Sequence, residues 1–300
     1  MISVIIPCFN SEKFVYRAIK SVLNQEYQDW ELILIDNNSS DNTLKILKDI
    51  QGKYPDKINV LEETKKGAPS ARNRGLFQAK GEWIQFLDAD DEILSNKFSH
   101  QLSSIKGNDI DLIVGGAKVE GIEAGKINRS KRDVKLMDPW VGLIISNLGI
   151  TSANLFKRQI LIDIGGWDEN LTSSQEYNLM FRMLKVGAKV WYDIEELTVI
   201  HILESGISRS TDVNRQIEIL SNRINLRLDI KTFLFKQGLL SSKLKSHINK
   251  YIYSSLKNEA HIIPNFVKMK LKELDLEVPF YFRFLKNIQG YILELKRKVA

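Results

Sequence analysis

A short acidic cluster, Asp88-Ala89-Asp90-Asp91, follows an apolar run that ends at Leu87. Where such a run ends and the chain turns, the carboxylates of Asp88 and Asp90 can bend toward one point. Mg²⁺ in proteins takes one or two carboxylates together with substrate phosphates, and a cation there would neutralise charge on a departing diphosphate. The cluster predicts a site for a divalent cation, Mg²⁺ or Mn²⁺, held by Asp88 and Asp90. Taken alone, the motif fits a solvated acidic turn better.

Two further residues that could contact a nucleotide follow other apolar runs. Asp36 ends the run 31–36, where a carboxylate can accept hydrogen bonds from a ribose or a base. Phe9 follows Pro7-Cys8, and a ring there could stack on a nucleobase, a contact worth about 1–3 kcal/mol. Each has an ordinary alternative: turn chemistry for Asp36 and a half-buried core ring for Phe9.

A basic side chain is available for the phosphates. Arg72 and Arg74 lie two residues apart and so point to different faces of a predicted helix. One of them can reach a phosphate, for which the guanidinium fork is well shaped, and we expect Arg72 to do so. No Gly-x-Gly-x-x-Gly or Walker motif follows the first apolar run, which disfavours a dinucleotide dehydrogenase or a P-loop ATPase.

Two more titratable residues come later in the chain. Glu176 stands at the start of a helix predicted around Gln175–Lys185, where the helix N-terminus stabilises the anion. That setting suits a general base, although for this position taken alone a simple first-turn acidic residue is the favoured interpretation. His201 ends a predicted strand and could be a third metal ligand or a phosphate donor, but a lone histidine is more often structural.

These residues need elements that bring them together. Apolar runs alternate with helical patterns over the first 115 residues, which predicts an α/β fold with a mostly parallel sheet covered by helices on both faces. The carboxyl ends of such strands share one edge, and ligands bind there. The predicted strands are 2–7, 31–36, 58–61, 82–87 and 111–114; the predicted helices include one from Phe14 to Leu23 capped by Asn10 or Ser11, one capped by Asp41, and one over 68–79.

The rest of the chain is less regular. Residues 115–150 contain scattered glycines and are expected to form a hairpin or a mobile loop. Order returns at Ala153–Phe156, and Val190–Tyr192 and Thr198–His201 are expected to be two short strands. Beyond about residue 210 the pattern is helical and basic.

Composition limits the class of protein. The chain is 43% hydrophobic and 27% charged, as in soluble globular proteins, and no apolar stretch approaches the roughly 18 to 20 residues that span a bilayer. The N-terminus has no basic n-region, so we expect a strand there and no signal peptide. The single cysteine, Cys8, allows no internal disulfide and fits a reducing cytoplasm.

Charge is unevenly distributed. Residues 1–205 hold 25 basic and 29 acidic residues (25 − 29 = −4), whereas residues 206–300 hold 18 and 8 (18 − 8 = +10). Such asymmetry suggests a tail that meets an acidic partner, either a lipid surface or nucleic acid. A solvated helical face is the alternative.

The order of the motifs strongly resembles family 2 glycosyltransferases over residues 1–205. The resemblance rests on five motifs in sequence: Val4-Ile5-Ile6-Pro7-Cys8-Phe9-Asn10; Ile33 to Thr43 with Asp36 and Asp41; Gly67 to Asn73; Phe86 to Asp91; and Gly165-Gly166-Trp167-Asp168-Glu169 followed by Gln175-Glu176-Tyr177. It implies a GT-A fold over 1–209, with a donor half at 1–115 and an acceptor half at 116–209, followed by a basic helical region at 210–300. It also implies a nucleotide-sugar donor, a UDP-sugar by preference, and inversion at the anomeric carbon.

The resemblance implies roles for individual residues. Those matching Pro7, Phe9 and Asp36 hold base and ribose; those matching Asp88 and Asp90 hold ribose and metal-diphosphate, with Ala89 between them at the donor. The catalytic base precedes Tyr177 and is usually Asp, so that Glu176 places the oxygens about one methylene further out. Trp167 and Asp168 could line an acceptor pocket, the alternative for Trp167 being a core side chain.

The expected setting is a cytoplasmic enzyme, at the inner face of the cell membrane if it contacts lipid, that builds surface polysaccharide on a saccharide or lipid-linked saccharide without binding nucleic acid. A basic amphipathic tail would then contact the membrane. Its apolar anchors could be Ile252, Leu256, Phe266, Met269, Tyr281, Phe282, Phe284 and Leu285. A nucleotidyltransferase is the alternative enzyme, although residues 9–12 lack its Gly-rich loop, and a non-catalytic sugar-nucleotide-binding or scaffold protein is the third.

Overall fold

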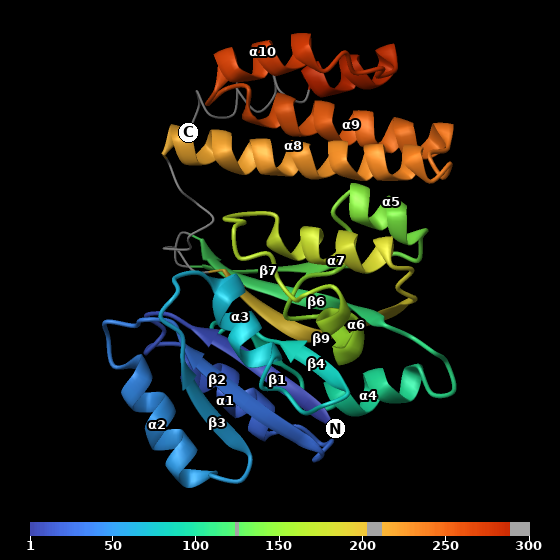
Figure 1. Cartoon of the computed structure of the whole chain (residues 1–300). Coiled ribbons are helices and arrows are strands. Elements are labelled where there is room, and N and C mark those ends of the chain that lie inside the picture. Colours follow the sequence, from blue (N-terminus) through green and yellow to red (C-terminus); the bar gives the residue numbers. More distant parts are fainter. Residues whose placement is uncertain (124–125, 203–211, 289–300) are drawn as a thin grey trace. The chain divides into compact units, whose positions relative to one another are not determined.

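The computed structural model describes residues 1–123, 126–202 and 212–288. The chain forms two compact units (Figure 1). Unit 1 comprises Met1–Pro139 and Asn147–Gly206, and unit 2 comprises Trp140–Ser146 and Ile207–Ala300. Each is described by itself.

Unit 1 is built on one mixed sheet with strand order β3-β2-β1-β4-β8-β6-β9-β5, with β7 paired to β6. The strands are β1 Ile2–Cys8, β2 Trp30–Asp36, β3 Ile58–Glu62, β4 Trp83–Phe86, β5 Glu92–Ile93, β6 Leu112–Glu123, β7 Lys126–Arg132, β8 Leu155–Lys157 and β9 Val190–Ile202. Strands β1 to β4 are mutually parallel, and β6 is parallel to β9, whereas β5, β7 and β8 are antiparallel to their neighbours. The predicted α/β class with a mostly parallel sheet is confirmed.

Helices cover both faces of this sheet (Figure 1). They are α1 Val15–Leu23, α2 Thr43–Lys53, α3 Ala68–Leu76, α4 Lys97–Ser104, α6 Arg158–Asp163 and α7 Gln175–Lys185. Alternate side chains of β1, such as Ile2, Val4 and Ile6, pack in one cluster with apolar residues of α1, α2 and α4. On the opposite face α3 approaches β1 closely: a Cβ at Gly75 would lie 2.5 Å from Ile5 Cγ2, so only glycine fits there.

Local interactions explain where the elements differ from expectation. Neither Asn10 nor Ser11 caps α1, which begins after Phe14 without a side-chain cap. Asn10 Oδ1 instead accepts from Ser40 N at 2.8 Å, and Ser11 N donates to Thr43 Oγ1 at 2.8 Å. The predicted cap residues thus join the loop after β1 to the loop after β2.

The middle of the chain is more regular than the sequence suggests. The stretch expected to be a hairpin or a loop is a hairpin, in which β6 pairs with β7, followed by a helix. The two short strands expected at 190–192 and 198–201 are one strand, β9, that pairs with β6 and carries a bulge opposite Gly115 and Gly116. Polar residues within the bulge, Asp193 to Glu196, had broken the apolar pattern without breaking the strand.

Unit 2 is helical, as predicted for the basic end of the chain. It contains α8 Val213–Lys236, α9 Ser242–Glu259, α10 Pro264–Glu273 and a further helical segment at residues 280–288. Most of α5, Pro139–Ile144, also belongs to it. Arg227 is 1% exposed, and its Nε donates to the Ile144 carbonyl at 3.0 Å, so this arginine fixes the end of α5 to α8. Among the described helices, none is long and apolar enough to cross a membrane.

Candidate active site

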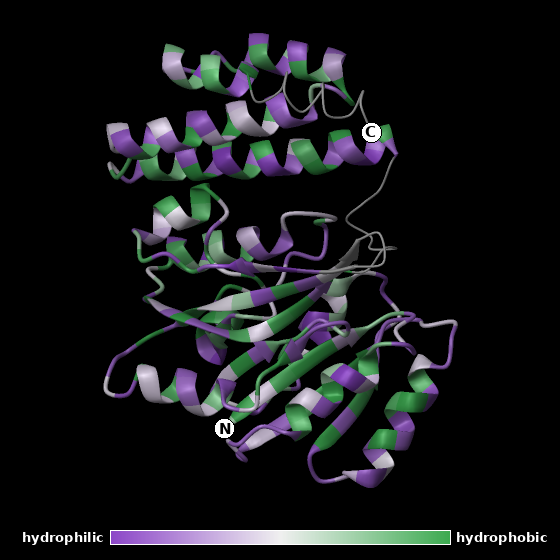
Figure 2. Ribbon diagram, turned by 180° about the vertical axis from the view of Figure 1, so that it is seen from behind, coloured by the Kyte–Doolittle hydropathy of each residue, from purple (hydrophilic) through white to green (hydrophobic). Residues whose placement is uncertain are grey.

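The carboxyl ends of β1, β2 and β4 meet at one edge of the sheet. The register pairs Cys8 with Asp36, and Ile5 with Phe86. The segments that follow these strands therefore lie beside one another, as the alternation of elements predicted. In the hydropathy view several strands of the sheet are largely green (hydrophobic), and purple (hydrophilic) stretches lie mainly in connecting loops and on parts of the helices (Figure 2).

Asp36 carries an unused acceptor at this edge. Its side chain is 4% exposed. Its Oδ2 accepts from Ser39 N at 3.2 Å, whereas its Oδ1 is buried and has no hydrogen-bond partner in the described part of the chain. An unsatisfied buried acceptor costs about 1–3 kcal/mol. A ligand that donates a hydrogen bond, such as a ribose hydroxyl or a base N–H, would remove that cost.

Phe9 and Pro7 lie at the end of β1. Phe9 is 52% exposed, which favours a free stacking surface over a half-buried core ring. Pro7 is partly buried. The neighbouring Asn37, which the sequence did not single out, donates to the Glu63 and Lys65 carbonyls at 2.8 Å and accepts from Gly67 N at 2.8 Å. It therefore fixes the loop that leads into α3.

Arg72 links three parts of the chain. Its Nη2 lies 2.7 Å from Asp88 Oδ1, and its Cζ lies 4.5 Å from the centre of the Trp167 ring. Its Nη1 lies 3.5 Å from Gln175 Oε1, at the start of α7. Arg72 is 7% exposed, and its Nε has no partner among the described residues. The guanidinium thus stands between the acidic cluster and α7, with a donor left for a ligand.

Trp167 is a buried support for this arginine. It is 2% exposed, and its ring meets Phe86 edge-on at 5.2 Å on one side and Arg72 on the other. A cation over an indole gains about 0.5–2 kcal/mol, depending on how well water is excluded. Of the two interpretations that the sequence left open, this burial supports a structural tryptophan over one that stacks on a sugar. Asp168, also partly buried, accepts from Asn170 N at 3.0 Å.

Asn73, which the sequence analysis did not single out, holds the segment that carries Trp167. Its Oδ1 accepts from Trp167 N at 2.7 Å, and its Nδ2 donates to the Trp167 carbonyl and to Glu169 Oε1. Lys65 pairs with Glu169 Oε2 at 2.6 Å. Only its place beside Arg72, in the motif Gly67 to Asn73, could have drawn attention to Asn73.

Replacing Gly166 with alanine should loosen this segment. Gly166 has φ +70°, and an added Cβ would lie 2.4 Å from Asn73 Oδ1. Gly165 has a similar φ of +77°, but its Cβ would meet nothing within 4 Å. We expect Gly165→Ala to cost about 1 kcal/mol in unfolding free energy from backbone strain, and Gly166→Ala about 1–3 kcal/mol more. Urea denaturation measures both; equal losses would contradict the close approach to Asn73.

Asp90 and Asp91 have different surroundings. Asp91 is 4% exposed and accepts from Ser152 Oγ at 2.6 Å and from His201 N at 3.3 Å; burial, with the Asp88 charge, raises its pKa to about 8. Burial and the Asp88 charge also raise the pKa of Asp90, whose carboxylate has no ion pair among those found in the described chain. Asp91 is thus bound into the fold, whereas the charged form of Asp90 is disfavoured where it stands, a cost that a cation beside it would offset.

His201 lies at the same edge. Its Nε2 is 2.7 Å from Glu92 Oε1, and its charge and that of Arg17 both act on Asp90 to lower its pKa. Arg17 Nη2 also donates to the Asp90 carbonyl at 2.6 Å. The structure therefore brings His201 to the acidic cluster but engages its Nε2 with Glu92. The metal-ligand role of His201 stays a prediction.

Glu176 faces the same site from α7. Thr151 donates to its Oε2 from both Oγ1, at 2.9 Å, and the backbone N, at 3.3 Å. Burial raises the pKa of Glu176, the Thr151 hydroxyl lowers it, Asp88 raises it further and Arg72 lowers it. Because charges act on a pKa only over short range in proteins, Glu176 shares one electrostatic environment with Asp88 and Arg72.

The carboxylates of this site can hold a divalent cation if the phosphates of a substrate supply the remaining ligands. Across the described residues, no three His, Cys, Asp or Glu side chains converge as a metal cluster. Mg²⁺ and Mn²⁺ sites that bind phosphorylated substrates need only one or two carboxylates. The unpaired, partly buried carboxylate of Asp90 beside Asp88 meets that requirement.

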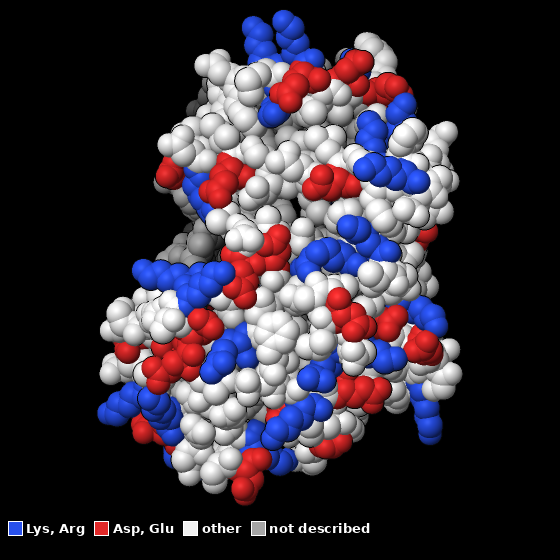
Figure 3. Space-filling view, in the orientation of Figure 1, with Lys and Arg blue, Asp and Glu red and all other residues white. Residues whose placement is uncertain are grey.

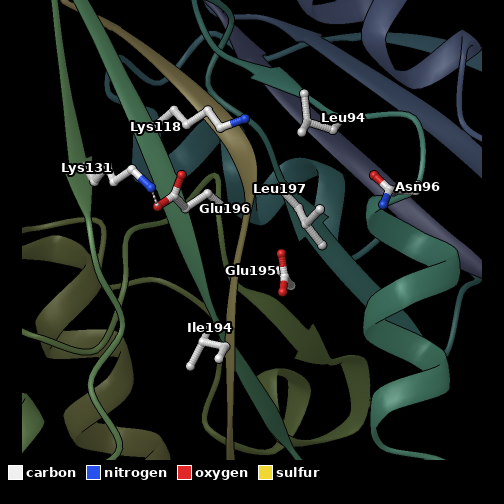
Figure 4. Close-up of a pocket in the computed structure, with 8 residues that line it drawn as sticks. All are labelled: Leu94, Asn96, Lys118, Lys131, Ile194, Glu195, Glu196 and Leu197. Atoms are coloured by element: carbon white, nitrogen blue, oxygen red, sulfur yellow. Dashed lines mark ion pairs between the residues drawn. The ribbon is translucent and has the colours of Figure 1, made fainter.

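A separate hollow of about 370 Å³ lies on the flank formed by β6, β7 and β9 (Figure 4). Leu94, Asn96, Lys118, Lys131, Ile194, Glu195, Glu196 and Leu197 line it. Lys131 and Glu196 pair across it at 2.5 Å. None of the sequence-predicted site residues lies in this lining.

Comparison with known proteins identifies the class that this fold and edge define. Residues 3–166, more than half of the chain, match Glycosyl transferase family 2. The chain belongs to this family. The family resemblance predicted from the motifs is confirmed, which disfavours the nucleotidyltransferase alternative.

Curated relatives cover differing shares of the chain, from 33% to 81% among those compared. A Haemophilus influenzae protein described as an uncharacterized glycosyltransferase is 36% identical over 135 residues, which are 44% of this chain and 54% of that protein. The Escherichia coli UDP-Glc:alpha-D-GlcNAc-diphosphoundecaprenol beta-1,3-glucosyltransferase WfgD is 39% identical over 122 residues, 40% of this chain and 46% of the relative. The chain thus spans about half the length of these two relatives.

Solved structures share the fold over nearly the whole chain. Residues 1–349 of S. aureus TarS in complex with UDP-GlcNAc align with a TM-score of 0.66 at 18% identity, covering 100% of this chain and 92% of that one. The mannosyltransferase PcManGT from Pyrobaculum calidifontis, in complex with GDP-Man and Mn²⁺, aligns with a TM-score of 0.59 at 15% identity, covering 97% and 84%. At these identities the likeness shows the fold alone.

Proposed function

We propose that this protein transfers a sugar from a nucleotide-sugar donor, a UDP-sugar, to an acceptor hydroxyl with inversion at the anomeric carbon. One observation carries the proposal: Arg72 contacts Asp88 Oδ1 at 2.7 Å and, at 3.5 Å, Oε1 of Gln175, the residue that precedes Glu176. A candidate base and candidate donor-binding groups therefore occupy one site. In the proposed division of the chain, residues 1–115 bind the donor, residues 116–209 the acceptor, and residues 210–300 form the basic helical region.

The donor would lie along the carboxyl edge of the sheet. Phe9 offers a ring for the base, with Pro7 two residues before it in β1, and the free Oδ1 of Asp36 offers an acceptor to the base or the ribose. Asp88 and Ala89 would contact the ribose and diphosphate. The Nε of Arg72, which has no partner among the described residues, would donate a hydrogen bond to the diphosphate.

Inversion requires a single displacement. Glu176 would take the proton from the acceptor hydroxyl as its oxygen bonds to the sugar C1, while the bond from C1 to the diphosphate oxygen breaks and both bonding electrons leave with the nucleoside diphosphate. No protein nucleophile takes part. Asp90, with Asp88 as a secondary ligand, would hold a Mn²⁺ or Mg²⁺ ion that supplies charge neutralisation to the departing diphosphate.

The acceptor is proposed to be a saccharide on a lipid carrier. This draws on the E. coli relative, whose name gives a diphosphoundecaprenol-linked acceptor. Transfer would then take place at the inner face of the cell membrane, in surface polysaccharide synthesis. Of Trp167 and Asp168, we propose Asp168 as the contact with the acceptor. Trp167 is only 2% exposed, which supports a positioning role for the tryptophan.

The test is release of UDP during incubation with UDP-sugars, Mn²⁺ and a GlcNAc-diphosphate-lipid acceptor. Acceptor-dependent release that stops on adding EDTA is expected. Release that persists in EDTA would contradict the metal site, and no release above buffer with any UDP-sugar would contradict the choice of donor. The anomeric configuration of the product, read by NMR coupling constants, tests inversion separately.

Replacing Asp36 with asparagine should weaken nucleotide binding while leaving the fold intact. Asparagine keeps an oxygen for Ser39 N but places an amide where the free Oδ1 stands. Because a hydrogen bond to a charged group is worth about 1.5–3 kcal/mol, the dissociation constant for UDP should rise about 10–100-fold. Calorimetric titration measures it, with exposed Asp49→Asn on α2 as the control. Unchanged affinity in Asp36→Asn would remove this residue from the donor site.

A further inference from the structure

The helical segment at residues 280–288 presents an apolar surface that is largely exposed. Phe280 is 83% exposed, and Tyr281, Phe284, Leu285 and Ile288 are between 41% and 58% exposed. At about 100° per residue, these five positions fall within an arc of about 140° of the helix. Single exposed apolar residues are ordinary, but a continuous apolar face is not.

The opposite side of this segment is fixed to the rest of unit 2. Phe282 is partly buried and meets Tyr253 of α9 at 6.5 Å between ring centres. Arg283 Nη2 donates to the Leu276 carbonyl at 2.9 Å, and Leu276 and Val278 are themselves buried. The exposed face is therefore held in place by buried contacts on the other side.

Burial separates the apolar residues that the sequence grouped as anchors. Ile252 and Leu256 are 0% exposed and form the helical core, so their assignment as anchors was wrong. Tyr281, Phe284 and Leu285 are exposed, as an anchor requires, and Met269 is 53% exposed on α10. The sequence pattern alone could not make this division, because both groups recur at helical spacing.

Charge indicates what this face meets. Arg283 and Lys286 are the charged residues of the segment, and no acidic residue occurs in it. By the same helical spacing Arg283 and Lys286 lie outside the apolar arc, whereas Lys250 of α9 borders it, with its Nζ 3.4 Å from Tyr281 Oη and 5.8 Å from the centre of the Tyr281 ring. Residues 206–300 as a whole hold 18 basic and 8 acidic residues. An apolar face on so basic a part of the chain suits the boundary between acyl chains and anionic headgroups. A protein partner would more often meet a rim of mixed, paired charges. Figure 3 shows Lys and Arg interspersed with Asp and Glu over the face of the molecule that it draws.

We propose that the apolar face of residues 280–288, formed by Phe280, Tyr281, Phe284, Leu285 and Ile288, docks on an anionic lipid bilayer. The proposal deepens the proposed function, on which it rests for the lipid-linked kind of acceptor. Aromatic rings enter the headgroup boundary, and Lys250, which borders the face at Tyr281, lies against the lipid phosphates. The enzyme is thereby kept where such an acceptor is anchored.

Flotation of the full chain with vesicles tests this. Wild-type protein should float with phosphatidylglycerol-containing vesicles and much less with phosphatidylcholine vesicles. The double substitution Phe280→Ser and Phe284→Ser should lower the bound fraction at least about tenfold, since two aromatic side chains leave the interface. Phe235→Ser is the matched control, because Phe235 is 73% exposed on α8, outside this face, and it should not alter binding.

Three results would overturn the proposal. Wild-type protein could fail to float, the double variant could float as well as wild type, or the double variant could convert a dimer into a monomer in sedimentation, which would identify a second copy as the occupant. Far-UV circular dichroism verifies that the variant is folded. UDP release with a soluble acceptor is read in parallel: it should be equal in both proteins, and its absence in both would count against the proposed function and leave the lipid result standing.

Discussion

Replacing Asp90 with alanine is expected to lower kcat for sugar transfer about 10²–10³-fold, the usual cost of losing a group that stabilises charge on a leaving oxygen. Asp90 is the carboxylate of the cluster without an ion pair in the described chain, and burial and Asp88 raise its pKa. Its charge is therefore costly until a cation neutralises it. Asp88 pairs with Arg72, and Asp91 is bonded to Ser152, so neither can substitute for it.

The measurement is initial UDP release at saturating donor over a range of Mn²⁺ concentrations. Calorimetric Mn²⁺ titration with UDP present gives a reading independent of turnover, and Asp90→Ala should lose that heat. Asp49→Ala, at an exposed acidic position on α2, is the control. Undiminished Mn²⁺ binding in Asp90→Ala would assign the cation to other ligands, His201 among them. Full activity without Mn²⁺ would exclude the metal from the reaction.

Glu176→Gln should lower kcat about 10²–10⁴-fold, the usual contribution of a general base. Glutamine keeps an acceptor oxygen for both Thr151 donors, so the fold around α7 should persist and KM for the donor should change little. Glu176→Asp should retain part of the activity, because it keeps a carboxylate. The rest should be lost, because the shorter side chain places the oxygens about one methylene away from their position in Glu176. Equal kcat in wild type and Glu176→Gln would remove this residue from catalysis.

The pH dependence of kcat/KM is a second, independent test of Glu176 as the base. A base acts only when deprotonated, so activity falls as pH drops through its pKa in the folded enzyme. Burial raises the pKa of Glu176 above its ordinary 4.5, and the Thr151 hydroxyl opposes this. The acidic limb of kcat/KM should therefore lie above pH 4.5, and Thr151→Val should move it further up. A limb unmoved by Thr151→Val would point to another base.

The sequence by itself determined which strands meet at the candidate site and which family the chain belongs to. Buried strands read as unbroken apolar runs, and polar residues after β1, β2 and β4 were predictable because parallel strands must end at one edge. The motifs around Asp36, Asp88 and Glu176 then sufficed to predict the family, because their order along the chain can be recognised without knowing which residues are in contact. The end of β2 at Asp36 and the bounds of α7 were also predicted correctly.

Only the tertiary structure decided what each side chain does at that edge. Asn73 and Asn37 organise loops through backbone groups far away in the chain, and no local pattern reveals such partners. Burial of Trp167 beneath Arg72 and exposure of Phe9 depend on packing from separate elements, and the bulged β9 depends on pairing with β6. The same holds for the helical unit: apolar spacing marked Ile252 and Tyr281 alike, and only packing divided the buried core from the face left open. Periodicity reports which side of an element is apolar, but what covers that side is fixed by the rest of the chain.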